Sequence, residues 1–315
     1  MAIKVSVINF KGGVGKSTLS FHLAAHLAAK ARVLVVDVDH QSSLSIVMMG
    51  GALWDKAASD RATCNTIFES FCNRRVSMPG AEIIHKNILH SRSPQYNFYP
   101  SLDLVPAQFE LDDTEIEMAS TTMGSAMLSE WHKRTLIAEW LDKVDADANY
   151  DYVIFDCPPA TKLVSQNALA ASNYFVIPVI PDAMSSRGVT HFRALVTNKI
   201  DRKLEFLRTG AAVADRDVPK AYCPATKMAA IAPFMAKPAG RANSGLTNIH
   251  TEQLAALRRQ WGNDMIKPVV KHMTGVAEAI DAGWPVWNAY KTQNIAKVIP
   301  MMKATCEAIA SRLVP

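Results

Sequence analysis

Residues 10–18 read Phe-Lys-Gly-Gly-Val-Gly-Lys-Ser-Thr and have the types and spacing that bind a phosphate group. Glycines let consecutive backbone N–H groups face one anion, and a helix that begins directly afterwards adds the partial positive charge of its N-terminus. The lysine before such a helix reaches the outer phosphates of a nucleotide, and the next hydroxyl ligates Mg²⁺. We therefore expect ATP and Mg²⁺ to bind here. The expected contacts are Gly12, Gly13, Val14, Gly15, Lys16, Ser17 and Thr18.

Three aspartates lie near the ends of two apolar runs. Asp37 and Asp39 belong to Val-Val-Asp-Val-Asp-His-Gln-Ser, which starts at residue 35, and Asp156 ends the run Tyr-Val-Ile-Phe-Asp. An aspartate at the carboxyl end of a strand lies in the crevice where open α/β sheets bind ligands. The sequence therefore places these carboxylates at the expected ligand-binding edge of the sheet.

The elements that would position these residues alternate between short apolar runs and longer helical patterns. The expected strands are 4–8, 33–37, 102–105, 152–156, 174–179, 228–234 and 266–270. The expected helices are 17–30, 131–144, 165–171, 187–207 and 251–261. Because the runs are apolar throughout, both faces of their sheet must be covered. The sequence therefore predicts an α/β fold with a mostly parallel central sheet and helices on both faces. No repeat or low-complexity linker divides the chain, so we expect a single domain over residues 1–315.

Two segments are expected to be additions to this pattern. Residues 42–100 are polar and irregular, with short helices expected at 64–75 and 80–88. Residues 209–227 carry mixed charges and two prolines, which predicts a surface excursion. Long excursions in a compact domain are often functional.

The composition narrows the class of protein. The apolar fraction is 49%, and no apolar run is long enough to cross a membrane. Five cysteines without a C-x-x-C pair indicate a reducing cytoplasm rather than a zinc or iron–sulfur site. The N-terminus leads straight into an apolar run, so we expect no secretory signal. His22 and His26 have a metal-binding spacing, but the alanines around them favour a packing helix.

The loop at 10–18 departs from the common phosphate-loop pattern, in which a glycine would stand at Phe10. It has a second lysine, Lys11, at its entrance instead. This resembles the deviant Walker A motif of the ParA/MinD family of partition and positioning ATPases. The resemblance implies that Lys11 reaches the nucleotide of a partner subunit in an ATP-sandwich dimer and neutralises charge in the transition state. The alternative is a solvated loop lysine.

The resemblance extends to the aspartates. Residues 35–42 are similar to the family's second motif, which implies that Asp39 orients the attacking water and Asp37 supports the Mg²⁺ shell. His40 stands where the family usually has proline. Residues 150–159, which end in Asp-Cys-Pro-Pro, look like the family's Walker B and switch II segments, with Asp156 near Mg²⁺. The likeness continues to about residue 290 and is weakest over residues 42–130, where we expect an elaborated segment.

The charge of the chain is unevenly distributed. Residues 199–315 hold 17 Lys and Arg against 9 Asp and Glu, whereas the rest of the chain is slightly acidic. A basic region can meet a polyanion such as nucleic acid, although solvated surface is the alternative. ParA-type proteins bind DNA non-specifically through this part of the chain. The residues that the resemblance implies for DNA phosphates are Lys199, Arg202, Lys203, Arg208, Lys237 and Arg241.

The resemblance thus implies a slow ATPase that forms a homodimer in the ATP state and binds non-specific DNA. A ParB-like partner would stimulate hydrolysis, so that plasmid, chromosome or another cargo is partitioned. We expect a cytoplasmic, nucleoid-associated protein that binds no membrane. The absence of a helix-turn-helix before the loop indicates no operator-specific binding.

Two alternatives stay open. One is a MinD-like membrane-associated positioning ATPase, and the other is a redox or metallo-enzyme of the same superfamily. The apolar stripe in residues 290–313 bears on the first, and we expect it to pack onto the domain.

Overall fold

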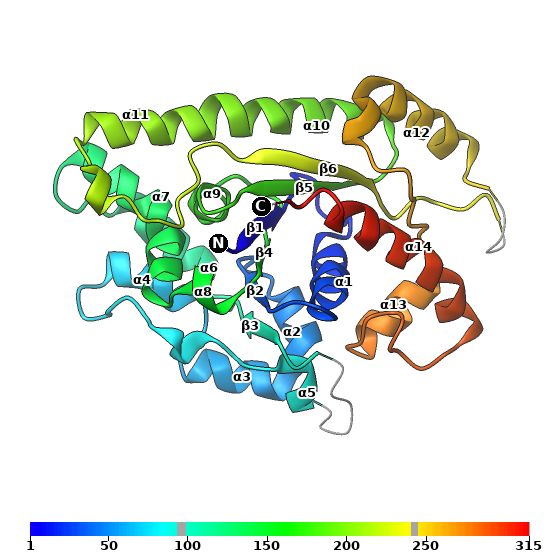
Figure 1. Cartoon of the computed structure of the whole chain (residues 1–315), viewed down its shortest axis with the longest axis horizontal. Coiled ribbons are helices and arrows are strands. Elements are labelled where there is room, and N and C mark those ends of the chain that lie inside the picture. The colour runs from blue at the N-terminus through cyan, green and yellow to red at the C-terminus, as the bar shows by residue number, and fades with distance from the viewer. Residues whose placement is uncertain (93–98, 241–244, 315) are drawn as a thin grey trace.

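The fold is built on one parallel sheet. The computed structural model describes residues 1–92, 99–240 and 245–314. Six strands follow the order β3-β2-β4-β1-β5-β6, and each is parallel to its neighbours (Figure 1). The strands are β1 (Ile3–Val7), β2 (Val33–Asp37), β3 (Leu102–Val105), β4 (Tyr152–Asp156), β5 (Tyr174–Val179) and β6 (Lys227–Pro233). All carboxyl ends therefore lie at one edge of the sheet. The neighbouring strands β1 and β4 are followed by helices on opposite faces, and such a switch point is where open α/β sheets bind ligands.

Helices cover both faces of the sheet, as predicted, and bury a separate hydrophobic cluster on each. One face carries α1 (Lys16–Ala28), α2 (Ser43–Met49), α3 (Gly51–Ser59), α5 (Ile88–Arg92), α13 (Thr274–Asp281) and α14 (Gln293–Ala310). The other cluster involves α4 (Asn65–Cys72), α6 (Leu111–Ser120), α7 (Ala126–Lys143), α8 (Ala146–Asn149), α9 (Leu163–Ala170), α10 (Ala183–Leu195), α11 (Arg202–Gly210) and α12 (Asn248–Trp261). Short helical turns are η1 (Ala81–Ile83), η2 (Val196–Asp201), η3 (Asp215–Asp217) and η4 (Gly262–Asp264).

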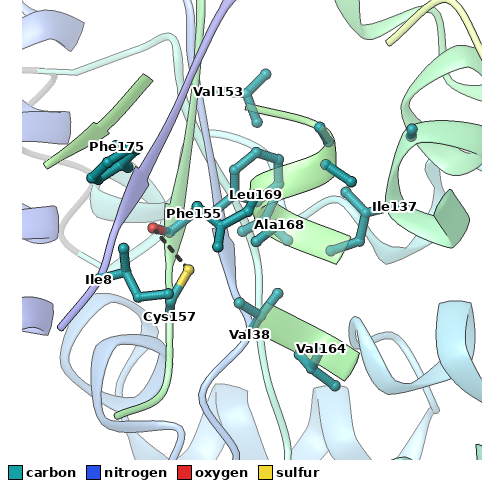
Figure 2. Packing of buried hydrophobic residues seen from close by; sticks show 14 of the residues in the cluster. Ile8, Val38, Ile137, Val153, Phe155, Cys157, Val164, Ala168, Leu169 and Phe175 are labelled. Atoms are coloured by element: carbon teal, nitrogen blue, oxygen red, sulfur yellow. Dashed lines mark hydrogen bonds between the residues drawn. The ribbon is translucent and has the colours of Figure 1, made fainter. Parts of the chain in front are cut away.

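Strand β4 contributes side chains to both hydrophobic clusters. Val153 and Phe155 point to one face, where they meet Ala168 and Leu169 of α9 (Figure 2), and Ile154 between them belongs to the other cluster. All three side chains are fully buried. The period of two along a strand explains the alternation, and burial on both faces explains the continuous apolar run. That the whole chain is one domain stays a prediction.

The expected strand at 266–270 is wrong. The segment runs beside β6, where Ile266 and Val270 donate backbone hydrogen bonds to Ile231 and Pro233, but it forms only isolated bridges at Met265 and Lys271. Pro268 lies in its middle. Proline has no backbone N–H to donate, so a regular ladder cannot continue through it.

Residues 42–100 are less irregular than predicted, since they contain α2, α3, α4 and α5. These helices have between five and nine residues. Gly50, with a φ of 78°, divides α2 from α3 and allows the chain to turn sharply there. Helices this short show little periodicity, and tertiary packing rather than propensity holds them.

The expected helix at 187–207 lies within one continuous helical run that contains a π-turn. Helix α10 starts at Ala183 and ends at Leu195, the π-helical turn η2 follows, and α11 then continues along nearly the same line (Figure 1). The three elements form one rod along a side of the molecule. A π-turn adds residues to a helix without ending it.

The C-terminal apolar stripe packs onto the protein, as predicted. Within α14, Met302, Cys306 and Ile309 are fully buried, and the helix contacts α1 and α13. Among the described residues, no helix is both long and apolar enough to span a bilayer.

Candidate nucleotide site

The glycine loop joins β1 to α1 at the carboxyl edge of the sheet. Gly15 has a φ of 85°, and a Cβ added there would lie 2.6 Å from Cδ1 of Phe234. Only glycine fits such a position, because its left-handed backbone and its close contact both exclude a side chain. Phe234 directly follows β6, so a residue after this edge strand of the sheet restricts the shape of the loop.

The loop presents unused hydrogen-bond donors. In the described part of the chain, the backbone N–H groups of residues 12–18 donate to no other group, whereas that of Lys11 donates to the Asn9 side chain at 3.1 Å. They border a hollow of about 350 Å³. Its lining comprises Gly12, Gly13, Gly15, Lys16, Ser17, Thr18, Asp39, Gln41, Ser43 and Pro159. Consecutive free N–H groups at a helix N-terminus form an anion site, so the residues fit a nucleotide phosphate chain.

Lys16 extends into this hollow from the first turn of α1. It is only 7% exposed. Burial lowers the pKa of Lys16, while the nearby Asp156 and Asp39 carboxylates act in the opposite direction. A lysine held this deeply, with free N–H groups beside it, is arranged to meet an anion.

Asp156 has one unused oxygen. Its Oδ1 accepts a hydrogen bond from Oγ of Ser20 at 2.8 Å, whereas its buried Oδ2 has no donor in the described structure. The Ser17 side chain lies next to this carboxylate. Burial raises the pKa of Asp156, because a buried charge without a partner is costly. A cation near Oδ2 would remove that cost, so Ser17 and Asp156 fit a Mg²⁺ site.

Asp37 is differently engaged. Its Oδ2 accepts hydrogen bonds from the backbone N–H and the hydroxyl of Ser45, at 2.9 and 2.6 Å, and its Oδ1 accepts from the N–H of Asp39 at 3.1 Å. Burial and the neighbouring Asp156 both raise the pKa of Asp37. Because both oxygens have donors, Asp37 anchors the start of α2 and the loop that carries Asp39.

Asp39 faces the hollow from the loop after β2. The residue is 7% exposed, and its Oδ1 accepts a hydrogen bond from the N–H of Gln41 at 3.0 Å. The predicted site residues from β1, β2 and β4 thus come together at one edge. Their roles in catalysis stay predictions.

Lys11 does not point into the hollow of its own chain. Its Nζ pairs with Oδ2 of Asp182, the N-cap of α10, and its side chain is 45% exposed. The Asp182 carboxylate also accepts hydrogen bonds from the N–H groups of Met184 and Ser185. The structure therefore shows Lys11 at the same edge as Lys16 but held to a different element.

Sequence reasoning missed three residues that hold this site in place: Ser20, Ser45 and Asp182. Asp182 could have been found, because an aspartate shortly after a strand and directly before a helix is an N-cap signal at the ligand-binding edge. The two serines gave no such signal, since small hydroxyls in helices are usually unremarkable.

The predicted DNA-binding residues fall into separate places. Lys199 lies in η2 and Arg202 and Lys203 begin α11, all three exposed. Arg208, on the same helix, is only 29% exposed and pairs with Asp215 at 2.5 Å.

Lys237 lies at the other end of the rod. Its N–H donates to His250, whose ring is also close to Lys11 and Asp182. The length of α10 alone puts roughly 20 Å between this end and Lys199, so these residues do not form one local cluster. Arg241 lies outside the described residues.

Among the described residues, no group of three or more His, Cys, Asp and Glu side chains could hold a metal ion. His22 is buried, and its ring bonds to the Thr18 carbonyl and the Val286 N–H. It therefore packs in the core, as predicted.

The site combines a glycine loop with free N–H groups, a buried lysine, and aspartates at the ends of two adjacent strands. These features define a P-loop nucleotide-binding protein. The additional Lys11 at the loop entrance places it in the deviant Walker A class. A family model described as an AAA domain matches residues 2–208, more than half of the chain, and the chain belongs to this family, as a ParA-type partition ATPase homologue.

Two curated relatives support this assignment. The sporulation initiation inhibitor protein Soj of Bacillus subtilis is 34% identical over 176 residues, which cover 56% of this chain and 57% of that protein. The chromosome partitioning protein ParA of Myxococcus xanthus is 33% identical over 198 residues, which cover 62% and 57% respectively. The matched region thus spans less than two thirds of these relatives.

Solved structures show the same fold over nearly the whole chain. An ATP complex of a Cyanothece McdA variant aligns with a TM-score of 0.67 at 16% identity and covers 99% of this chain and 96% of that one. The pNOB8 ParA structure, bound to nonspecific DNA, aligns with a TM-score of 0.57 at 17% identity, covering 99% and 98%. At such identities the likeness concerns the fold.

Proposed function

We propose that this chain is a ParA-like ATPase that forms a sandwich dimer around two ATP molecules, binds DNA non-specifically as that dimer, and hydrolyses ATP slowly. A ParB-like partner stimulates hydrolysis and releases the dimer, so that plasmid or chromosomal DNA or another cargo is partitioned. The protein acts in the cytoplasm on the nucleoid and as a single domain.

One observation carries the proposal. Lys11 lies at the entrance of the glycine loop, half-exposed, and its amine turns away from its own hollow toward Asp182. A lysine at this edge that does not serve its own site is available to a second copy of the chain. The site of one subunit is then incomplete until the other brings its Lys11.

Each residue has a part in the proposed reaction. The N–H groups of residues 12–18 and Lys16 hold the phosphates of ATP, and Ser17 and Asp156 hold Mg²⁺ with its water shell. Mg²⁺, when bound, offsets negative charge on the phosphates. Asp39 orients the attacking water, and Lys11 of the partner subunit stabilises the charge that develops on the transferred phosphoryl group.

DNA binding is proposed from two observations. Lys199, Arg202 and Lys203 are exposed, and the DNA-bound pNOB8 ParA has the same fold. Such side chains grip phosphates and do not read sequence. Against the MinD-like alternative, the apolar stripe of α14 is buried against the protein rather than free to enter a membrane.

The test is the ATP-dependent mass of the chain in solution, measured by light scattering. Asp39→Ala removes the water-orienting carboxylate but none of the phosphate contacts, so we expect this variant to bind ATP and remain a dimer without turnover. Asp39→Ala together with Lys11→Ala should bind ATP and stay a monomer. A monomeric Asp39→Ala protein with ATP bound would contradict the proposal, and so would normal hydrolysis by that variant.

A further inference from the structure

His40 follows Asp39 in the loop after β2 and has no part in the proposed reaction as described. Its Nδ1 lies 3.8 Å from Oδ1 of Asp39, an ion-pair distance, and its side chain is 34% exposed. In the described structure its backbone N–H donates to no acceptor. The residue therefore interacts with the site through its ring and not through its backbone.

The position of this ring matters because of how Asp39 is held. The N–H of Asp39 is fixed to Asp37, and Oδ1 accepts a hydrogen bond from the N–H of Gln41. Among the described groups, no donor binds Oδ2. A carboxylate that orients water through one oxygen needs the other oxygen held still, and a single neutral hydrogen bond restrains it weakly.

The charged groups around His40 come from several elements. Asp39 lies on its own loop. From α6, Glu115 is close enough to sense the charge of His40. Lys162, which precedes α9, contacts Asp112 and Glu115 of α6 at 3.2 and 3.9 Å, and Lys16 of α1 faces Asp39. The His40 ring thus lies near two carboxylates, Asp39 and Glu115.

We infer that His40 is the positioning residue for Asp39: its ring lies against Oδ1 and restricts the carboxylate, so that Oδ2 keeps one direction toward the attacking water. The inference rests on the proposed hydrolysis of ATP. It assigns to the His40 side chain what a stiff residue could do at this place by restricting the loop.

The test compares kcat and ATP affinity of four proteins: the wild type, two His40 variants and a control variant. His40→Asn removes the ring, and we expect kcat to fall by at most about fivefold, the most that one partly exposed contact supplies. Its affinity for a fluorescent ATP analogue should be unchanged. His40→Pro replaces the ring with a stiff backbone, which the unused N–H allows, and should restore kcat.

His132→Asn is the matched control. His132 pairs with Glu139 at 3.0 Å on α7 and is exposed to a similar extent, but it does not line the hollow. This variant should keep the wild-type kcat. A His40→Asn protein with wild-type kcat would overturn the inference, and so would one that loses ATP affinity. If the wild-type chain failed to hydrolyse ATP at all, the proposed function itself would fall, so the two failures are distinguishable.

Discussion

The nucleotide edge and the α10–α11 rod both carry charges for which we propose a function, and they hold these charges in opposite ways. At the edge, Lys16, Asp37 and Asp156 are at most 7% exposed, and the two aspartates have specific donors. On the rod, Lys199 and Arg202 are exposed, with no ion pair found for them in the described structure. Buried charges act in fixed geometry and are hardly screened, whereas exposed ones act additively and weaken with salt. Single substitutions should therefore abolish function at the edge and only reduce it on the rod.

The largest effect is expected for Lys16→Ala. It removes a buried cation from between Asp156 and Asp39, so ATP affinity should fall by about 100-fold or more. Titration with a fluorescent ATP analogue measures this. Lys30→Ala, an exposed lysine just after α1, is the control and should bind like the wild type. Comparable affinity in both variants would break the contrast between buried and exposed charge.

The second prediction concerns a buried group that must stay neutral. Burial lowers the pKa of His22 to about 4. Between pH 4 and 6.5 the unfolded chain therefore binds the extra proton, so this contribution to stability is complete above about pH 6.5 and is lost as the pH falls. From pH 7 to pH 5 the free energy of unfolding should drop by about 2 kcal/mol through His22.

Denaturant unfolding of wild type and His22→Gln at both pH values measures this loss. Glutamine keeps one donor and one acceptor for the Thr18 carbonyl and the Val286 N–H but cannot titrate. The pH dependence should shrink by that amount in the variant. An unchanged dependence would show that His22 is not the group responsible.

The third prediction concerns the exposed charges of the α10–α11 rod. Lys199→Ala and Arg202→Ala should each weaken DNA retention modestly and lower the slope of log affinity against log salt by about one. ATP affinity should not change. Arg208→Ala should have a smaller effect, because Arg208 already pairs with Asp215. An abrupt loss of DNA binding from either single substitution would mean that the rod holds a fixed site and not an additive surface.

The smallest effect is expected for Asp182→Asn. Asparagine still caps α10 but removes the charge that holds Lys11 in its own subunit. The dimer should then form at a lower ATP concentration, by at most about fivefold, since exposed ion pairs contribute about 1 kcal/mol or less. Light scattering across an ATP titration follows this. A higher ATP requirement would indicate that Asp182 assists the dimer instead of competing with it.

The sequence predicted the nucleotide edge much better than the other parts of the fold. The strands that end at Asp37 and Asp156 matched their expected bounds, because continuous apolar runs that end in aspartate are a strong local signal. The pairing of Lys11 with Asp182 joins residues 171 positions apart, and no local pattern encodes it.

The other errors also have physical causes. Helices α2 and α3 are too short to show a clear period, and their boundary depends on the left-handed backbone of Gly50. At 266–270 the apolar pattern of a strand was present, but Pro268 removes the donor that a ladder needs. Lys199 and Lys237 lie far apart because α10 runs straight between them. Lys237 lies near Lys11 and the start of α10, whereas Lys199 lies beyond its end.

The central claim is a dimer that needs ATP before its exposed charges can hold DNA. Retention of the wild-type chain on non-specific duplex DNA, measured with ATP, with ADP and without nucleotide over a salt titration, tests it most directly. We predict retention with ATP alone, lost steadily as salt rises. Equal retention in all three states, or none with ATP, would contradict the account.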